Sequence, residues 1–178
     1  LLFLKERPKG ASGSVVTPHM AGSKPLLVEV QALVTNTSQP MPRRTFLGME
    51  AQRIWLILAV LEKRLGVGVG SRDVFLNVTG GVKIQETASD LAAVIAILSS
   101  YFDQPIPEDM VVWGEVGLGG EVRSVSNPEL RIREAKKLGF GSIILPKGNM
   151  SELKEKEGLS LHGVRDLREV MRLLFGRR

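Results

Sequence analysis

The chain has 178 residues, with 24 lysines and arginines against 19 aspartates and glutamates, which gives a formal net charge of +5. It contains no cysteine, which excludes a disulfide framework, a zinc knuckle and a thiol nucleophile, and its 43% hydrophobic residues exclude a largely disordered chain. No apolar run approaches the roughly 20 residues of a membrane-spanning helix, and the four residues at the start are too few for a signal peptide. We therefore expect a cytoplasmic domain with a sizeable core and no membrane partner, and the first residue, Leu1, suggests a fragment of a longer chain.

In chain order, hydrophobic periodicity and turn signals predict alternating strands and helices. In the first half we expect an arm or linker over 1–13, strands at 14–17 and 26–35, a loop at 36–44, a helix at 49–65, a strand at 73–79 with an extended continuation at 82–85, and a helix at 87–100. In the second half we expect a hairpin of 111–118 and 121–125, a helix from Asn127 to Leu138 with Asn127 as its cap, a strand at 142–145 and helices at 151–157 and 166–175. This alternation predicts one mixed α/β domain over residues 14–178.

The charge is unevenly distributed along the chain. Residues 1–50 carry +3, residues 51–121 carry −4 and residues 122–178 carry +6. Basic ends of this kind are either solvated helix faces or a surface for phosphates. Only 5% of the residues are aromatic, which argues against base stacking and favours contact with a nucleic-acid backbone.

Motifs for independent catalysis are scarce. His19 and His162 are far apart in the sequence, so we expect no metal site. The glycines at 66–70 are not followed by Lys-Ser/Thr, so they do not form a phosphate-binding loop of the Walker type. Ser89 begins a helix and is a candidate nucleophile, although a serine at that position is more often a helix cap.

Several segments in order resemble a known family. They are SKPLLVEVQALV at 23–34, PRR at 42–44, LAVLEKRLG at 58–66, DVFLNVTGGVKI at 73–84, GEVGLGGEVR at 114–123 and KKLGF at 136–140. Together they resemble the C-terminal Lon-protease-like domain of the bacterial RadA/Sms family of recombination and repair proteins, over about residues 5–175. The resemblance implies the α/β fold of the Lon proteolytic domain, of the ribosomal-protein/GHMP-kinase type.

The resemblance also implies that the protease chemistry is lost. Lon-type proteases use a Ser–Lys dyad, and aligning the segments places Ala88 at the serine position and Arg131 at the lysine position. Alanine has no nucleophilic oxygen, and arginine stays protonated and cannot act as a general base. A slip of one residue would bring in Ser89 but would leave Arg131 unsuited, so a Ser-dependent peptidase remains the weaker alternative.

What the resemblance implies instead is a DNA repair and recombination role. The parent would be a ring-forming, RecA-like ATPase that acts on branched DNA, with ATP, magnesium and zinc bound only in upstream domains and no cofactor in this segment. This domain would bind single- or double-stranded DNA, assemble into a ring, expected to be a hexamer, and have the RecA recombinase as a further partner. A purely structural oligomerisation module is the other alternative.

Basic residues in turns and at strand edges are the candidate DNA contacts. Lys24, Lys83 and Arg123 have glycine neighbours that permit close approach of a ligand. A second, weaker set comprises Arg43, Arg44, Arg131 and Arg133. The competing interpretation is that these are ordinary exposed charges that discourage edge-to-edge strand pairing.

Overall fold

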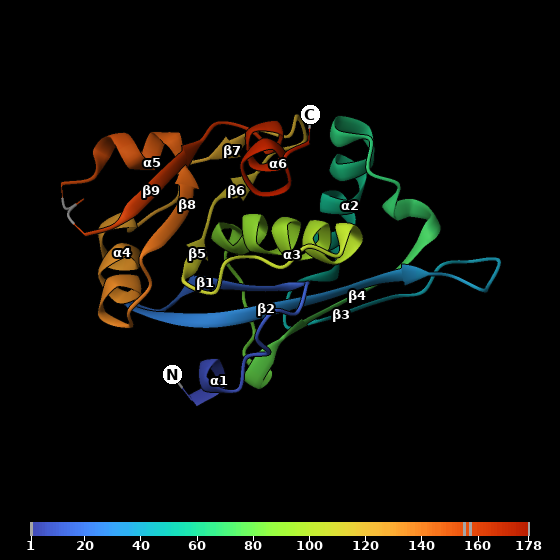
Figure 1. The fold of residues 1–178 in the computed structure, drawn as a ribbon, viewed down its shortest axis with the longest axis horizontal. Helices are drawn as coiled ribbons and strands as arrows, with labels where there is room; N and C mark the ends of the chain where they lie inside the picture. Colours follow the sequence, from blue (N-terminus) through green and yellow to red (C-terminus); the bar gives the residue numbers. More distant parts are fainter. Residues whose placement is uncertain (1, 155, 157, 178) are drawn as a thin grey trace.

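The computed structural model describes residues 2–154, 156 and 158–177. Within them, the chain forms one seven-stranded sheet with the order β3-β4-β2-β1-β5-β8-β9 and a separate two-stranded sheet of β6 and β7 (Figure 1). β2 pairs antiparallel with both β1 and β4, whereas the other four pairings of the large sheet are parallel. The predicted mixed α/β, single-domain fold is confirmed.

The strands of the large sheet are β1 (Ser14–Ala21), β2 (Lys24–Asn36), β3 (Arg44–Leu47), β4 (Arg72–Val78), β5 (Met110–Val112), β8 (Ser142–Pro146) and β9 (Ser160–Val164), and those of the small sheet are β6 (Glu115–Val116) and β7 (Val122–Arg123). The α-helices are α1 (Leu2–Lys5), α2 (Ala51–Leu65), α3 (Asp90–Phe102), α4 (Pro128–Lys137), α5 (Lys147–Glu152) and α6 (Leu167–Phe175). Short 3-10 turns, η1 (Val69–Ser71), η2 (Thr79–Gly81) and η3 (Thr87–Ser89), flank β4 and precede α3.

The large sheet separates two cores. Val28 and Val30 of β2 point to the first core, which α2, α3 and α6 cover, and Leu27 points to the second core, which α4 covers. This is the period-two alternation expected of a strand. α3 is apolar on every side, and all residues from Asp90 to Ser99 are buried. Such a helix is stable only when surrounded by protein, so it fixes the position of the turn that precedes it, η3.

Several predicted elements differ from the structure. The predicted loop at 36–44 ends in the edge strand β3, which pairs in parallel with β4. The predicted hairpin of 111–118 and 121–125 is divided: β5 belongs to the large sheet, and only β6 and β7 pair around the turn. The sequence does not predict β9 at all. The sequence signals are weak here because β3, β6, β7 and β9 are at most five residues long, too short for a clear period.

The helix termini also differ. α5 begins at Lys147 instead of at the predicted residue 151, and residues 155 and 157 of the predicted helix lie outside the described part of the chain. Asn127 precedes α4 but has left-handed backbone angles and makes no side-chain capping bond, so the predicted side-chain cap is wrong. Asp166 does cap α6 through the Glu169 N–H, as expected of an aspartate at that position. No helix within the described residues is long and apolar enough to cross a membrane.

Candidate functional site

Ala88 and Arg131, the two positions of the predicted dyad, are both buried. Ala88 lies in η3, immediately before α3, and Arg131 lies in the first turns of α4, with 1% of its surface exposed. A buried arginine must find acceptors for its N–H groups. Arg131 donates to the carbonyl oxygens of Pro18 and Ser126, each at 2.9 Å, and to the carboxylate of Glu86.

Glu86 links three elements at this point. Its Oε1 accepts from Arg131, and its Oε2 accepts from the backbone N–H of Met20 in β1 at 2.7 Å. His19 Nδ1 lies 3.6 Å from the same Oε2. An ion pair therefore occupies the position that the sequence resemblance aligns with the lysine of a Ser–Lys dyad, and it joins α4 to β1 and to the segment before η3.

The side chains at the two dyad positions do not form a Ser–Lys pair. The side chain of Ala88 has no oxygen, and the guanidinium of Arg131 cannot act as a general base. The neighbouring Ser89 is fully buried, and its Oγ has no hydrogen-bond partner among the described residues. A nucleophilic serine needs a general base within hydrogen-bond reach, and the buried Ser89 Oγ has no such partner among the described residues, so the structure does not favour the peptidase alternative.

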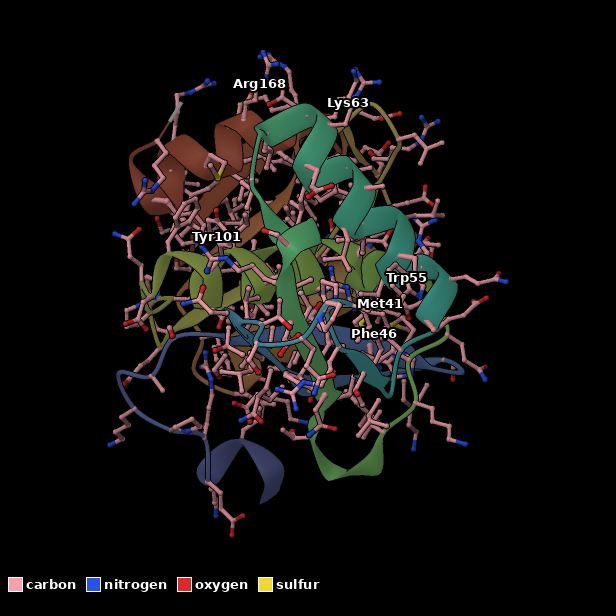
Figure 2. All side chains as sticks on the ribbon, turned by 90° about the vertical axis from the view of Figure 1, so that its right-hand side faces the viewer. Met41, Phe46, Trp55, Lys63, Tyr101 and Arg168 are labelled. Carbon is pink, nitrogen blue, oxygen red and sulfur yellow. The ribbon has the colours of Figure 1, made fainter. Side chains whose placement is uncertain are left out.

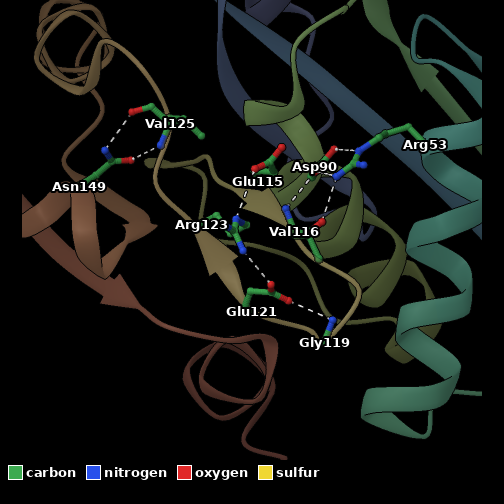
Figure 3. A network of polar contacts seen from close by, with 9 residues as sticks. All are labelled: Arg53, Asp90, Glu115, Val116, Gly119, Glu121, Arg123, Val125 and Asn149. Carbon is green, nitrogen blue, oxygen red and sulfur yellow. Dashed lines mark hydrogen bonds and ion pairs between the residues drawn. The ribbon is translucent and has the colours of Figure 1, made fainter.

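A second buried ion pair lies on the other side of η3 (Figure 3). The carboxylate of Asp90 is fully buried and is paired with the guanidinium of Arg53 from α2. Burial raises the pKa of Asp90, and the hydrogen bonds from Arg53 oppose that rise. The carboxylate of Asp90 also accepts a hydrogen bond from the N–H of Val116, and Arg53 donates to the carbonyl oxygen of Val116, both at 3.0 Å. These two side chains thus occupy the backbone groups on the open edge of β6, so an extended peptide cannot add to that edge by pairing at Val116.

The three principal DNA-contact candidates are all exposed. Lys24 begins β2 at the tight turn from β1, and Lys83 follows η2. Arg123, on β7, is 61% exposed, but it is paired with Glu121 at 3.1 Å and lies 3.8 Å from Glu115. In Figure 3 the Arg123 side chain extends between these two carboxylates. Lys24 and Lys83 are therefore the cations of this set with the fewest local constraints.

The second set of candidates is largely engaged in internal contacts. Arg43 forms a two-pronged contact with Asp73 at 2.9 and 3.0 Å. Arg44 donates to the carbonyls of Arg72, Val69 and Gly70. Arg131 is buried as described, and Arg133 is exposed on α4. Arg43, Arg44 and Arg131 thus serve the fold, which makes them poorer candidates for a ligand than the first set.

The Asp73–Arg43 contact makes a pH-dependent contribution to stability. The backbone N–H and then the guanidinium of Arg43 hold the pKa of the buried Asp73 below its usual value. Because the folded-state pKa is depressed, the contribution is present above the ordinary pKa of an aspartate and is lost as the pH falls through the lowered value. We expect Arg43→Ala to flatten the loss of unfolding free energy between about pH 7 and about pH 3, measured by urea titration. The flattening should be partial, because the N–H remains, and an identical pH profile would contradict the assignment.

Sequence reasoning missed the acidic partners of both ion pairs, Glu86 and Asp90. One signal was available for the first: an arginine at a position that the family fold buries requires a carboxylate partner. Which carboxylate supplies it could not be read from the sequence, since 45 residues separate Arg131 from Glu86. His19 and His162 lie in different surroundings, the first beside Glu86 and the second beside Ser160. No group of three or more potential ligands suited to a metal ion occurs among the described residues.

Comparison with known proteins assigns the chain to a family. Residues 51–149, more than half of the chain, match the family model described as subunit ChlI of Mg-chelatase. The chain belongs to this family. The matched region includes Arg53, Glu86, Asp90 and Arg131, the four side chains that form the two buried ion pairs.

Curated relatives resemble the chain over almost its whole length. It is 46% identical to DNA repair protein RadA of Bacillus subtilis over 176 residues, 45% identical to that of Chlamydia pneumoniae and 44% identical to that of Escherichia coli. These alignments cover 98%, 98% and 96% of this chain, respectively, but only 38%, 39% and 37% of those proteins. The predicted resemblance to RadA is confirmed, and the chain spans somewhat over a third of the length of these relatives.

Proposed function

We propose that this chain is a non-proteolytic, Lon-like domain of a DNA repair ATPase, and that it contacts the DNA backbone and supports ring assembly. The observation that carries the proposal is the 43–46% identity to DNA repair proteins across nearly all of the chain. The ATP-driven processing of branched DNA would belong to the whole protein, with ATP, magnesium and zinc held elsewhere. The RecA recombinase is a further proposed partner, and the cytoplasm is the proposed location.

The residues at the former dyad support a non-catalytic role. A peptidase of this type needs a serine with a neutral lysine beside it, whereas this chain carries Ala88 and an arginine paired with Glu86. The ion pair replaces a reactive group with a structural one. The proposed domain therefore acts through its surface.

DNA contact is proposed to run through Lys24, Lys83 and Arg123. All three are exposed and lie at strand ends or turns. Contacts from such cations to phosphates carry no sequence information and release bound counterions. Binding should accordingly be independent of sequence and steeply weakened by salt.

An exposed apolar surface supports the assembly part of the proposal. Phe46 and Trp55 lie on the side of the molecule that faces the viewer in Figure 2. The Phe46 and Trp55 rings pack edge to face with their centroids 5.9 Å apart, and Trp55 remains 51% exposed. Clustered exposed apolar side chains are typical of protein interfaces. A module that only assembles, without DNA affinity, is the competing function that this surface favours.

The DNA-contact residues can be tested with the variant Lys24→Ala/Lys83→Ala/Arg123→Ala. We expect it to bind a fluorescent DNA duplex more weakly at low salt, with the slope of log affinity against log salt reduced by about 0.9 for each phosphate that the variant no longer neutralises. Lys137→Ala, an exposed change on α4, is the matched control. Fluorescence anisotropy over a salt series gives both quantities, and unchanged binding by the triple variant would overturn the assigned surface.

A further inference from the structure

A basic hollow lies between β7, the start of α5 and the loop that joins β9 to α6. Its volume is about 600 Å³, and its walls are Val122, Arg123, Ser124, Lys147, Gly148 and Arg165. We refer to it as the Lys147 hollow. Two of its three cations, Lys147 and Arg165, belong to none of the DNA-contact candidates above, and they account for part of the +6 charge of residues 122–178.

The backbone around the hollow is held rigidly. The Val122 N–H donates to the carbonyl of Arg165 at 2.8 Å, which joins the β7 wall to the β9–α6 loop. The buried side chain of Asn149, in α5, both donates to and accepts from the backbone of Val125 at 3.0 Å (Figure 3). These bonds tie all three elements together. The cations around the hollow are therefore carried by a preformed frame, which lowers the cost of ordering them on binding.

Lys147 is a cation without a carboxylate partner among the described residues. Its aliphatic stem packs over Gly163, where a Cβ would lie only 3.1 Å from the Lys147 Cδ. The absence of a side chain at Gly163 thus leaves room for the Met150 side chain and for the stem of Lys147, while the exposed Lys147 keeps its ammonium group in solvent. The contact brings the stem of Lys147 to the wall of the hollow and leaves its charge open to a ligand.

Arg165 and Arg123 carry carboxylate neighbours but retain free donors. Arg165 lies 3.9 Å from Glu169, and Arg123 lies 3.1 Å from Glu121 and 3.8 Å from Glu115. Exposed pairs at such distances contribute little energy. A guanidinium has five N–H donors, and Arg123 uses one of them in its hydrogen bond to Glu121, so donors remain available to a further anion. An incoming anion can therefore bind both arginines without first displacing their carboxylate neighbours.

Ser124 adds an uncharged donor to the wall. Its Oγ lies against the backbone of Gly148, where a Cβ would be 2.3 Å from that oxygen. A side chain at residue 148 would consequently displace the hydroxyl. Lysine, arginine and serine side chains together are the donors that proteins use most often for phosphate oxygens.

We propose that the Lys147 hollow seats a phosphodiester group of a DNA backbone, with Lys147 and Arg165 as its principal contacts and Arg123 as a shared one. This inference rests on the proposed DNA binding and adds to it a contact site on the C-terminal third of the chain. The site would extend the DNA path from Arg123 toward α5 and the start of α6. Binding at this site would not depend on the DNA sequence, because each of its donors contacts a phosphate and not a base.

The test uses the variant Lys147→Ala/Arg165→Ala, with Lys137→Ala as the matched control and Lys24→Ala/Lys83→Ala as the comparison. Each protein is titrated with a fluorescent DNA duplex over a salt series, and its thermal unfolding is followed in parallel. We expect the Lys147/Arg165 variant to unfold like the parent, because both side chains are exposed, and to reduce the log–log salt slope by about 1.8, or about 0.9 for each of the two cations removed. The control should leave the slope unchanged.

The outcomes separate the inference from the proposed function. An unchanged slope in the Lys147/Arg165 variant, with a reduced slope in the Lys24/Lys83 variant, would overturn the Lys147 hollow and leave DNA binding in place. A parent chain that binds no DNA would overturn both. Inorganic phosphate can also be tested as a competitor at matched ionic strength. If it competes with DNA for the parent but not for the Lys147/Arg165 variant, and that variant binds DNA like the parent, the hollow binds a small anion. That result would also contradict the inference.

Discussion

Replacing Arg53 with alanine is expected to lower the free energy of unfolding by about 3–5 kcal/mol. The change leaves the fully buried carboxylate of Asp90 without its cation and removes a donor from the carbonyl of Val116. A buried charge that loses its partner is among the most destabilising single changes known. Urea or thermal unfolding of the variant beside the parent measures the effect. Lys63→Ala, an exposed change on the same helix, should have a free energy of unfolding within about 0.5 kcal/mol of the parent's.

The Arg53 variant should also respond to pH in a defined direction. Burial already raises the pKa of Asp90, and without Arg53 that pKa should rise further. Because the folded-state pKa lies above the unfolded one, protonation favours the folded state, so the deficit should shrink as the pH falls toward the ordinary carboxyl value of about 4. A deficit that stays constant, or grows on acidification, would show that the missing stability does not come from the isolated carboxylate.

Arg131→Ala is expected to lower the free energy of unfolding by a similar amount, about 3–5 kcal/mol. The substitution removes the donors to two carbonyl oxygens and the partner of Glu86, and it leaves a cavity beside β1. The free energy of unfolding of Arg131→Lys should lie between those of Arg131→Ala and the parent. An ammonium retains the charge but cannot reach three acceptors in the fixed geometry of a guanidinium. The free energy of unfolding is the readout, with Lys137→Ala on the same helix as the control. A loss below about 1 kcal/mol for Arg131→Ala would mean that the pair does not hold α4 to β1.

Much of the fold could be predicted from the sequence because its main elements have strong periods. α2 ends at Gly66 with left-handed backbone angles, as predicted from the glycine, and the apolar run before Ser99 forms the buried α3. The short strands could not be placed, because their pairing depends on partners distant in the chain: β3 pairs with β4, and β9 pairs with β8. Short edge strands take their structure from tertiary context more than from local preference.

The candidate site, like the fold, could be predicted from the sequence only in part. The family resemblance placed Ala88 and Arg131, and the structure adds that Glu86 takes up the charge of Arg131. The partners Glu86 and Asp90 became visible only when the fold brought distant segments together. The same holds for the Lys147 hollow, whose cations come from three elements that lie up to 42 positions apart, from Arg123 to Arg165. Local patterns identify charged residues, whereas the tertiary fold decides which of them are paired and which remain available.

We propose that this chain binds DNA through phosphate contacts on a domain without protease chemistry. The most direct test is the affinity of the unaltered chain for a DNA duplex of arbitrary sequence, measured across a salt series. We expect the logarithm of affinity to fall linearly with the logarithm of salt concentration, with a slope of about −0.9 for each phosphate contacted, and a second duplex of unrelated sequence to give the same line. Absent binding at low salt, or an affinity that salt does not change, would contradict it.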